Sequence, residues 1–231
     1  MIGILGGMGT QAGLDFCNKL AKLNRGKLDQ QYPMFVLYNK SNTPKRPENL
    51  KKYYNVLKAL VDGCKMLQKN KCKFIVMPCN TAHYWHEDIQ KKIKIPLLSM
   101  PKEVYLHTKK TCKKNSTIGI LCTEATLKTN IYNDYFDKNF KLISPEKNLQ
   151  KNSVNKAIKF VKMGKVKEAE IALRSAVKYL IKKKCKKIIL GCTELPIAIF
   201  AYKSFRKAKE SKLFIDPNLL LAEVCMKKYK K

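Results

Sequence analysis

Two cysteines in similar surroundings are the residues of this chain best suited to proton-transfer chemistry. Cys79 stands in Met-Pro-Cys-Asn-Thr, and Cys192 stands in Gly-Cys-Thr-Glu, each after a short apolar run. In an open parallel sheet, ligands bind beyond the carboxyl ends of the strands. A helix start after a strand presents backbone N–H groups to anions. Because such a position also lowers the pKa of a cysteine, we expect both thiols to form thiolates readily.

Two thiols on opposite sides of one carbon atom are suited to stereoinversion. One sulfur, as thiolate, removes the α-proton, and the other, as thiol, returns a proton to the opposite face. Each sulfur must approach the carbon to about 3–3.5 Å, so the pair should lie roughly 7 Å apart around a substrate. The sequence therefore predicts an acid and base pair if the fold brings the two cysteines together.

The segments that carry these cysteines occur twice in the chain. Residues 64–81 align without gaps on residues 177–194, with eight of 18 positions identical and Cys79 opposite Cys192. Residues 2–10 resemble residues 118–126 at five of nine positions, with a similar offset. Lysine bias alone accounts for up to four of the eight matches, but the shared apolar pattern favours a duplicated half.

Strands and helices are predicted to alternate in both halves. Apolar runs rich in β-branched residues, or bounded by Pro and Gly, predict strands at 2–5, 34–38, 74–77, 97–98, 118–121, 142–143 and 188–190. Helical patterns cover 13–24, 50–69, 130–136, 153–163, 167–183 and 217–229. This alternation predicts an α/β fold of two pseudo-symmetric domains, each a mostly parallel sheet flanked by helices, with the active site between them. The expected first domain comprises residues 1–98 and 208–231, and the second comprises residues 99–207.

Charge and composition restrict the class of protein. The net charge is +31, with 44 lysines but only four arginines. Arginine suits bidentate recognition of bases and phosphates, and the lysines are scattered, so we expect a solvated basic surface rather than a nucleic-acid site. No apolar run reaches the ~18 residues of a membrane span, and no signal peptide is evident. We therefore expect a cytoplasmic protein with no nucleic-acid or membrane partner, and a basic nucleic-acid-binding protein is the remote alternative.

The motifs resemble those of the cofactor-independent aspartate/glutamate racemase family. The resemblance rests on IGILGGMG at residues 2–9, PCNTAH at residues 78–83 and GCTELP at residues 191–196, and it extends over essentially the full length. It implies two α/β domains of common origin and racemisation of an acidic amino acid, L-aspartate and possibly L-glutamate, without pyridoxal phosphate. It also implies a two-base mechanism and a homodimer.

The resemblance assigns roles to individual residues. It makes Cys79 and Cys192 the catalytic pair. The residues that it places around the substrate amino and carboxylate groups are Met8, Asn80, Thr81, Thr126 and Thr193. It makes Arg46 and Lys162 candidates for binding the side-chain carboxylate, while Glu194 either contacts substrate or orients the Cys192 turn. Lys45 and Thr10 depart from the aspartate and proline that are usual in the family.

Other interpretations fit these motifs less well than a racemase does. The other seven cysteines are expected to be buried structural thiols. The glycines at 6, 7 and 9 do not fit the spacing of a dinucleotide loop, and His83 and His86 fit structural or surface roles better than metal ligation. We therefore expect no cofactor and no metal ion. A broad-specificity amino-acid racemase or a related isomerase on the same scaffold is the alternative function.

Overall fold

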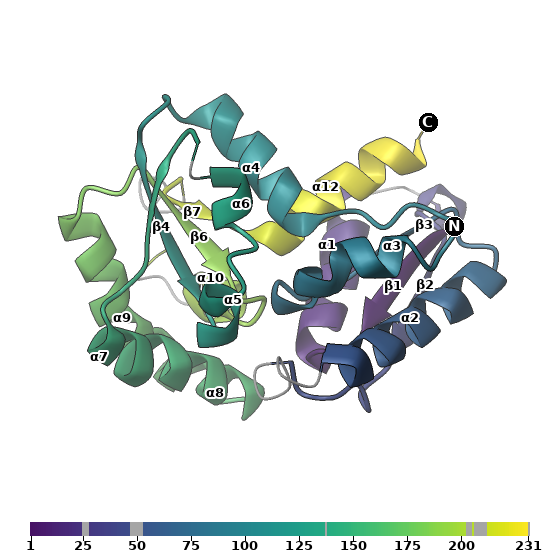
Figure 1. Ribbon diagram of the computed structural model, residues 1–231, viewed down its shortest axis with the longest axis horizontal. Helices are drawn as coiled ribbons and strands as arrows, with labels where there is room; N and C mark the ends of the chain where they lie inside the picture. Colours follow the sequence, from purple (N-terminus) through teal and green to yellow (C-terminus); the bar gives the residue numbers. More distant parts are fainter. Residues whose placement is uncertain (25–27, 47–52, 137, 202–204, 206–211, 231) are drawn as a thin grey trace. The chain divides into compact units, whose positions relative to one another are not determined.

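Two parallel sheets form where the sequence carries its short apolar runs (Figure 1). The computed structural model describes residues 1–24, 28–46, 53–136, 138–201, 205 and 212–230. The chain divides into one unit of Met1–Glu103 with Asn218–Lys231 and a second unit of Val104–Pro217. The division between Glu103 and Val104 falls later in the chain than the expected boundary after residue 98. The expected boundary between residues 207 and 208 lies outside the described residues.

The first unit is built on a three-stranded parallel sheet. Its strands are β1 (Ile2–Gly6), β2 (Phe35–Asn39) and β3 (Phe74–Val76), in the order β2-β1-β3. Ile2 pairs with both Phe35 and Phe74, so all three strands run in register from their first residues. Its helices are α1 (Thr10–Leu23), α2 (Tyr53–Lys69), α3 (His86–Gln90), α4 (Met100–Thr111, which continues into the second unit) and α12 (Pro217–Tyr229), with short 3-10 turns η1 (Asp29–Gln31) and η2 (Thr81–Trp85).

Both faces of this sheet are covered. On one face Ile2 and Ile4 pack with side chains of α1 and α12, and on the other Leu5 packs with α2. A sheet buried on both sides needs nearly continuous apolar strands, which is why β1 is entirely buried. No helix in the described part of the chain is long and apolar enough to cross a lipid bilayer.

The second unit contains a four-stranded parallel sheet. Its strands are β4 (Thr117–Cys122), β5 (Lys141–Ile143), β6 (Lys187–Gly191) and β7 (Phe214–Ile215), in the order β5-β4-β6-β7. Its helices are α5 (Glu124–Lys128), α6 (Asn133–Phe136), α7 (Lys147–Leu149), the π-helix η3 (Gln150–Asn155), α8 (Lys156–Lys162), α9 (Val166–Lys182) and α10 (Leu195–Ala201). The apolar stripe predicted on the helix at 167–183 is confirmed, because Leu173, Ala176 and Leu180 of α9 are fully buried.

The two units repeat the same connection from helix to strand. The chain leaves α2 through Lys71 and leaves α9 through Lys184, and both residues adopt a φ of 58°. A left-handed residue is a common way to end a helix, yet lysine is an unusual residue for it. Since these two lysines are aligned in the sequence repeat, their shared conformation supports a duplicated half.

A second similarity between the units is the close approach of one strand, β1 or β4, to the connection between helix and strand. A Cβ atom on Gly3 would lie 3.1 Å from the Cβ of Cys72, and a Cβ on Gly119 would lie 3.2 Å from the Sγ of Cys185. Cys72 and Cys185 are aligned in the repeat, as are the strands that carry the two glycines. Glycine therefore permits the same close approach of strand and connection in both units.

Several predicted elements differ from those observed. The expected strand at 97–98 makes only one isolated bridge, between Ile75 and Leu97. The helix expected at 153–163 instead begins as a π-helix at Gln150 and becomes α-helical at Lys156. Residues 50–52 of the helix expected at 50–69 lie outside the described residues, and α2 begins at Tyr53. The elements that were not predicted include helices α3, α4, α5, α7 and α10 and strand β7.

Candidate active site

Both cysteine turns lie beyond the carboxyl ends of equivalent strands. Cys79 follows β3 after Met77 and Pro78, and Cys192 directly follows β6. The side chains are buried alike, with 6% and 7% of their surface exposed. Each turn then enters a helical segment, η2 after Cys79 and α10 after Cys192. The expected placement of the two cysteines at strand ends is therefore observed in each unit.

A buried histidine holds the backbone of the Cys79 turn. The Nδ1–H of His83 donates to the carbonyl oxygen of Cys79 at 2.9 Å, and its Nε2 accepts from the backbone N–H of Met100 at 3.1 Å. Burial, and to a smaller extent the neighbouring His86, lower the pKa of His83 to about 4. His83 is therefore a neutral imidazole with both nitrogens occupied, which fits the structural role expected from the sequence rather than metal ligation.

The remaining predicted residues of the first unit lie in two places. Asn80 and Thr81 are buried at the start of η2, next to Cys79. Met8 is buried in the turn between β1 and α1, and the Nη2 of Arg46 donates to its backbone carbonyl. Arg46 also donates from Nη1 to the carbonyl of Pro44 at 3.2 Å. The structure thus brings Arg46 to the Met8 turn, where it ties together the loops that follow β1 and β2.

Gly7 makes this junction of loops possible. It has a φ of +86°, and a Cβ there would lie 2.3 Å from the backbone carbon of Lys40 and 2.6 Å from the nitrogen of Ser41. Backbone atoms cannot yield by changing a rotamer, so only glycine fits this position. The glycine-rich segment at 6–9 therefore serves a close crossing of two backbone loops.

The thiol of Cys192 bonds directly to a carboxylate. Its Sγ donates to the Oε2 of Glu194 at 3.0 Å, and the Oε1 of Glu194 lies 3.8 Å from the Nζ of Lys162. Glu194 is buried, whereas 56% of the Lys162 side chain is exposed. Of the two roles left open for Glu194, the structure shows contact with the cysteine. Lys162 is close to the carboxylate of Glu194.

The pKa of Cys192 moves in the direction opposite to the one expected. Burial raises it well above its ordinary value, and the charge and hydrogen bond of Glu194 raise it further, while Lys162 opposes part of this change. The expectation of a lowered pKa at a helix start is therefore wrong for Cys192. Desolvation and a neighbouring anion outweigh the backbone N–H groups, so this group is a thiol at neutral pH.

The second unit also presents two buried threonines. Thr193 follows Cys192, and Thr126 lies in the first turn of α5, which follows β4. Thr123 caps this helix by accepting from the N–H of Thr126 at 3.1 Å, and the two hydroxyl oxygens are 3.0 Å apart. Because β4 and β6 are neighbours, Thr126 and the Cys192 turn occupy the same end of the sheet.

Two buried residues near this turn were missed in the sequence. Tyr132 has its pKa raised by burial and by the proximity of Cys122 and Cys192. Gln150 donates from Nε2 to the carbonyl of Cys122 at 2.8 Å. Neither residue belongs to the repeated segments, and tyrosine and glutamine carry no motif of their own, so the sequence held no signal for them.

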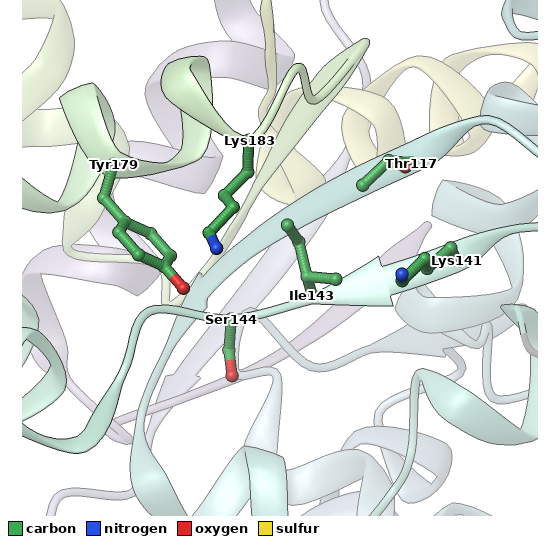
Figure 2. Close-up of a pocket in the computed structure, with 6 residues that line it drawn as sticks. All are labelled: Thr117, Lys141, Ile143, Ser144, Tyr179 and Lys183. Atoms are coloured by element: carbon green, nitrogen blue, oxygen red, sulfur yellow. The ribbon is translucent and has the colours of Figure 1, made fainter.

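A pocket of about 420 Å³ lies elsewhere on the second unit (Figure 2). It is lined by Thr117, Lys141, Ile143, Ser144, Tyr179 and Lys183. The Nζ of Lys183 lies 5.3 Å from the centre of the Tyr179 ring, and the hydroxyl of Tyr179 donates to Glu146 at 3.2 Å. None of the predicted site residues lines this pocket, which is a groove between α9 and the sheet edge formed by β5.

Comparison with known families identifies one that covers most of the chain. The model of the family described as Asp/Glu/Hydantoin racemase matches residues 5–225. The broad-specificity amino-acid racemase RacX of Bacillus subtilis (strain 168) is 30% identical over 199 residues, covering 84% of this chain and 86% of that protein. These matches confirm the family resemblance that the motifs indicated.

Solved structures with the same fold are also found. The aspartate racemase of Picrophilus torridus superposes with a TM-score of 0.83 at 28% identity, covering 100% of this chain and 94% of that one. An aspartate racemase homologue from Pyrococcus horikoshii OT3 has a TM-score of 0.78 at 22% identity, covering 100% and 99%. The expected α/β class, with parallel sheets flanked by helices, is confirmed.

Proposed function

Because the chain belongs to the Asp/Glu/Hydantoin racemase family, we propose that it racemises an acidic amino acid, interconverting L- and D-aspartate, with Cys79 and Cys192 as the two acid and base groups. The observation that best supports this is the buried hydrogen bond from Cys192 to Glu194, at the turn that is equivalent to the Cys79 turn. A buried thiol bonded to a carboxylate is kept protonated, as a group that delivers a proton must be before the reaction, and a second cysteine at the matching turn supplies its counterpart. The reaction needs no cofactor.

The proton balance of the proposed reaction follows from the state of Cys192. Cys79, as thiolate, takes the α-proton, and the electron pair of the broken C–H bond remains on Cα as a carbanion. Cys192, as thiol, then gives its proton to the opposite face of Cα, and the new C–H bond completes the inversion. Turnover leaves a thiol at Cys79 and a thiolate at Cys192, next to the carboxylate of Glu194. Cys79 then loses its proton to solvent and Cys192 takes one up, which the carboxylate favours because it disfavours a neighbouring anion, and the starting state is restored.

Two cations in the candidate site support an acidic substrate. The exposed Lys162 ammonium near Glu194 can turn toward a second carboxylate, and Arg46 lies at the Met8 turn. Similarity to the P. torridus aspartate racemase favours aspartate. A cytoplasmic homodimer acting on this small substrate is part of the same proposal.

A broad-specificity amino-acid racemase is the second candidate function. RacX of B. subtilis, at 30% identity, supports it. In addition, Lys162 already has a carboxylate neighbour in Glu194, so an acidic substrate side chain is not required to balance its charge. The two candidates differ only in which side chains the site accepts.

Deuterium incorporation tests the proposal. The protein is incubated with each of a panel of L-amino acids in D₂O, and deuterium at Cα and the D-enantiomer are measured together. Aspartate should gain deuterium at Cα and approach an equal mixture of the two enantiomers, and neutral amino acids should react much more slowly. If neutral amino acids react at comparable rates, the second candidate is correct. Absence of both products for every amino acid would contradict the proposed function.

Cysteine variants test the assignment of roles. Cys79→Ala and Cys192→Ala should each lower racemisation by about 10²–10⁴-fold, the usual contribution of a general acid or base. Cys72→Ala and Cys185→Ala are matched controls, because these two buried cysteines are aligned in the repeat and lie one in each unit. Both controls should keep their activity. Normal turnover in either Cys79→Ala or Cys192→Ala would contradict the two-base scheme.

A further inference from the structure

A buried side-chain amide in the second unit has an oxygen atom with no hydrogen-bond partner among the described residues. Gln150 begins the π-helix η3, and only 4% of its surface is exposed. Its Nε2 donates to the carbonyl oxygen of Cys122 at 2.8 Å and to the Oδ1 of Asn155 at 2.9 Å. Among the described residues, no donor lies within hydrogen-bonding distance of its buried Oε1. Buried polar atoms in folded proteins are nearly always paired, so this oxygen marks a place that a donor should reach.

The neighbours of Gln150 fix which end of its amide is the oxygen. The carbonyl of Cys122 can only accept a hydrogen bond. Asn155 donates from Nδ2 to the Oε1 of Glu124 at 2.7 Å, so it turns its own oxygen toward Gln150. Two acceptors at one end of the amide require the NH₂ group there. The Oε1 of Gln150 therefore points away from both of them.

This amide lies at the end of the sheet that carries the Cys192 turn. Cys122 is the last residue of β4, and it pairs in register with Gly191, the residue before Cys192. Figure 1 shows α7 and α8, the helices on either side of η3, beyond the ends of the arrows of β4 and β6, and η3 packs against β4. A π-helix is rare and is often found at functional sites. Gln150 is thus placed by an unusual helix beside the candidate active site.

We propose that the Oε1 of Gln150 accepts a hydrogen bond from the α-ammonium group of the amino-acid substrate, an inference that rests on the proposed function. The carboxylates of such a substrate need donors, whereas its ammonium group needs acceptors. An amide oxygen accepts without taking a proton, so the ammonium keeps the positive charge that acidifies the adjacent Cα–H bond. Glu194, the buried carboxylate of the Cys192 turn, is already bonded to Cys192. Because Oε1 is covered by its neighbours, the ammonium reaches it after a side-chain rotation of the kind common on binding.

A pair of ligands that differ in the ammonium group tests this contact. DL-aspartate, which undergoes no net reaction, and succinate, which lacks the amino group, are titrated calorimetrically into wild-type protein and the Gln150→Met variant. The variant should bind aspartate about 10- to 100-fold more weakly, as expected for loss of a hydrogen bond to a charged group, and should bind succinate as wild type does. If another amino acid is the one racemised, that amino acid and its deamino analogue take their place.

Two further variants separate contact from structural support. Ser153→Ala removes a hydroxyl of the same π-helix that bonds the carbonyl of Ala172 in α9, so it should lower stability without changing the ratio of the two affinities. Gln150→Glu keeps an oxygen acceptor at this position and should retain the preference for aspartate over succinate. Equal weakening of both ligands in Gln150→Met, or no weakening of aspartate, would overturn the contact while leaving the proposed function intact. Failure of the wild-type protein to bind any amino acid would overturn both.

Discussion

The two cysteine turns differ in the atom that their polar neighbour contacts. After β3, the imidazole of His83 bonds the backbone carbonyl of Cys79 and not its sulfur. After β6, the carboxylate of Glu194 bonds the sulfur of Cys192 itself. In the first turn the side chain fixes a backbone conformation. In the second it changes the affinity of the thiol for its proton.

This difference is confined to a few residues on a repeated scaffold. The connections through Lys71 and Lys184 are alike, and so are the close approaches at Gly3 and Gly119. In the sequence repeat, Glu194 stands opposite Thr81, so one half has a carboxylate where the other has a hydroxyl. A duplicated fold can therefore present two similar cysteines and still place a carboxylate at the sulfur of only Cys192.

Removing the carboxylate of Glu194 should have the largest effect on this difference between the two turns. In Glu194→Gln, the negative charge no longer raises the pKa of Cys192, although burial still does, so the thiol should ionise at lower pH than in wild type. Racemisation should fall by about 10³-fold, within the usual range for acid and base groups, because no negative charge then favours the protonated form of Cys192. Mass spectrometry of the Cys192 peptide after timed exposure to iodoacetamide over a range of pH measures the change.

Lys162→Met is the matched control for that variant. Lys162 lowers the pKa of Cys192, so its loss should move the alkylation midpoint to higher pH, opposite to Glu194→Gln. The shift should be small because the lysine side chain is more than half exposed and its charge is screened by solvent. Movement of both midpoints in the same direction, or an unchanged midpoint in Glu194→Gln, would show that Glu194 does not control the thiol.

His83 should make the first unit sensitive to acid. Its pKa is lowered from 6.5 to about 4 in the folded chain, so between these pH values the unfolded chain binds a proton that the folded chain does not. Stability contributed by the neutral histidine is therefore full above pH 6.5 and is lost as pH falls toward 4, by about 3 kcal/mol. Urea unfolding at pH 7 and pH 4.5 measures this loss.

Comparison with His83→Gln isolates the contribution of the histidine. The variant should be less stable than wild type at pH 7, and its stability should fall less between pH 7 and pH 4.5 because the titrating group is gone. Carboxylates elsewhere titrate equally in both proteins and cancel in the comparison. An identical pH dependence in the variant would show that the folded chain accommodates a charged His83.

The long elements of the fold could be predicted because their signals are local. Strand β1 is a continuous apolar run, and α9 carries a regular apolar stripe, so each can be recognised from neighbouring residues alone. Strand β7 has only two residues, too few to show a pattern. Helix α4 has a proline in its first turn and exposed lysines in its last, and its apolar face is less regular than that of α9.

The candidate site was predictable to the extent that it depends on motifs. The sequence repeat identified Cys79 and Cys192, and the fold places both at strand ends. The raised pKa of Cys192 depends on its burial and on the rotamer of Glu194, which no local pattern reports. Gln150 reaches the carbonyl of Cys122 from 28 residues away along the chain, so only the folded structure brings them together.

The smallest predicted effects are losses of folding stability when alanine replaces the equivalent glycines Gly3 and Gly119. In Gly3→Ala, the new methyl group would meet the Cβ atoms of Cys72 and Leu67 at 3.1 and 3.2 Å, and these atoms move only with the backbone. In Gly119→Ala, the closest atom is the Cδ1 of Leu180 at 2.9 Å, the end of a side chain that can rotate. Overpacking costs about 1–3 kcal/mol, so Gly3→Ala should lose roughly 2 kcal/mol and Gly119→Ala about 1 kcal/mol. Chemical denaturation measures both values, and an equal or larger loss in Gly119→Ala would show that the two packing arrangements are not distinguished by the mobility of their neighbours.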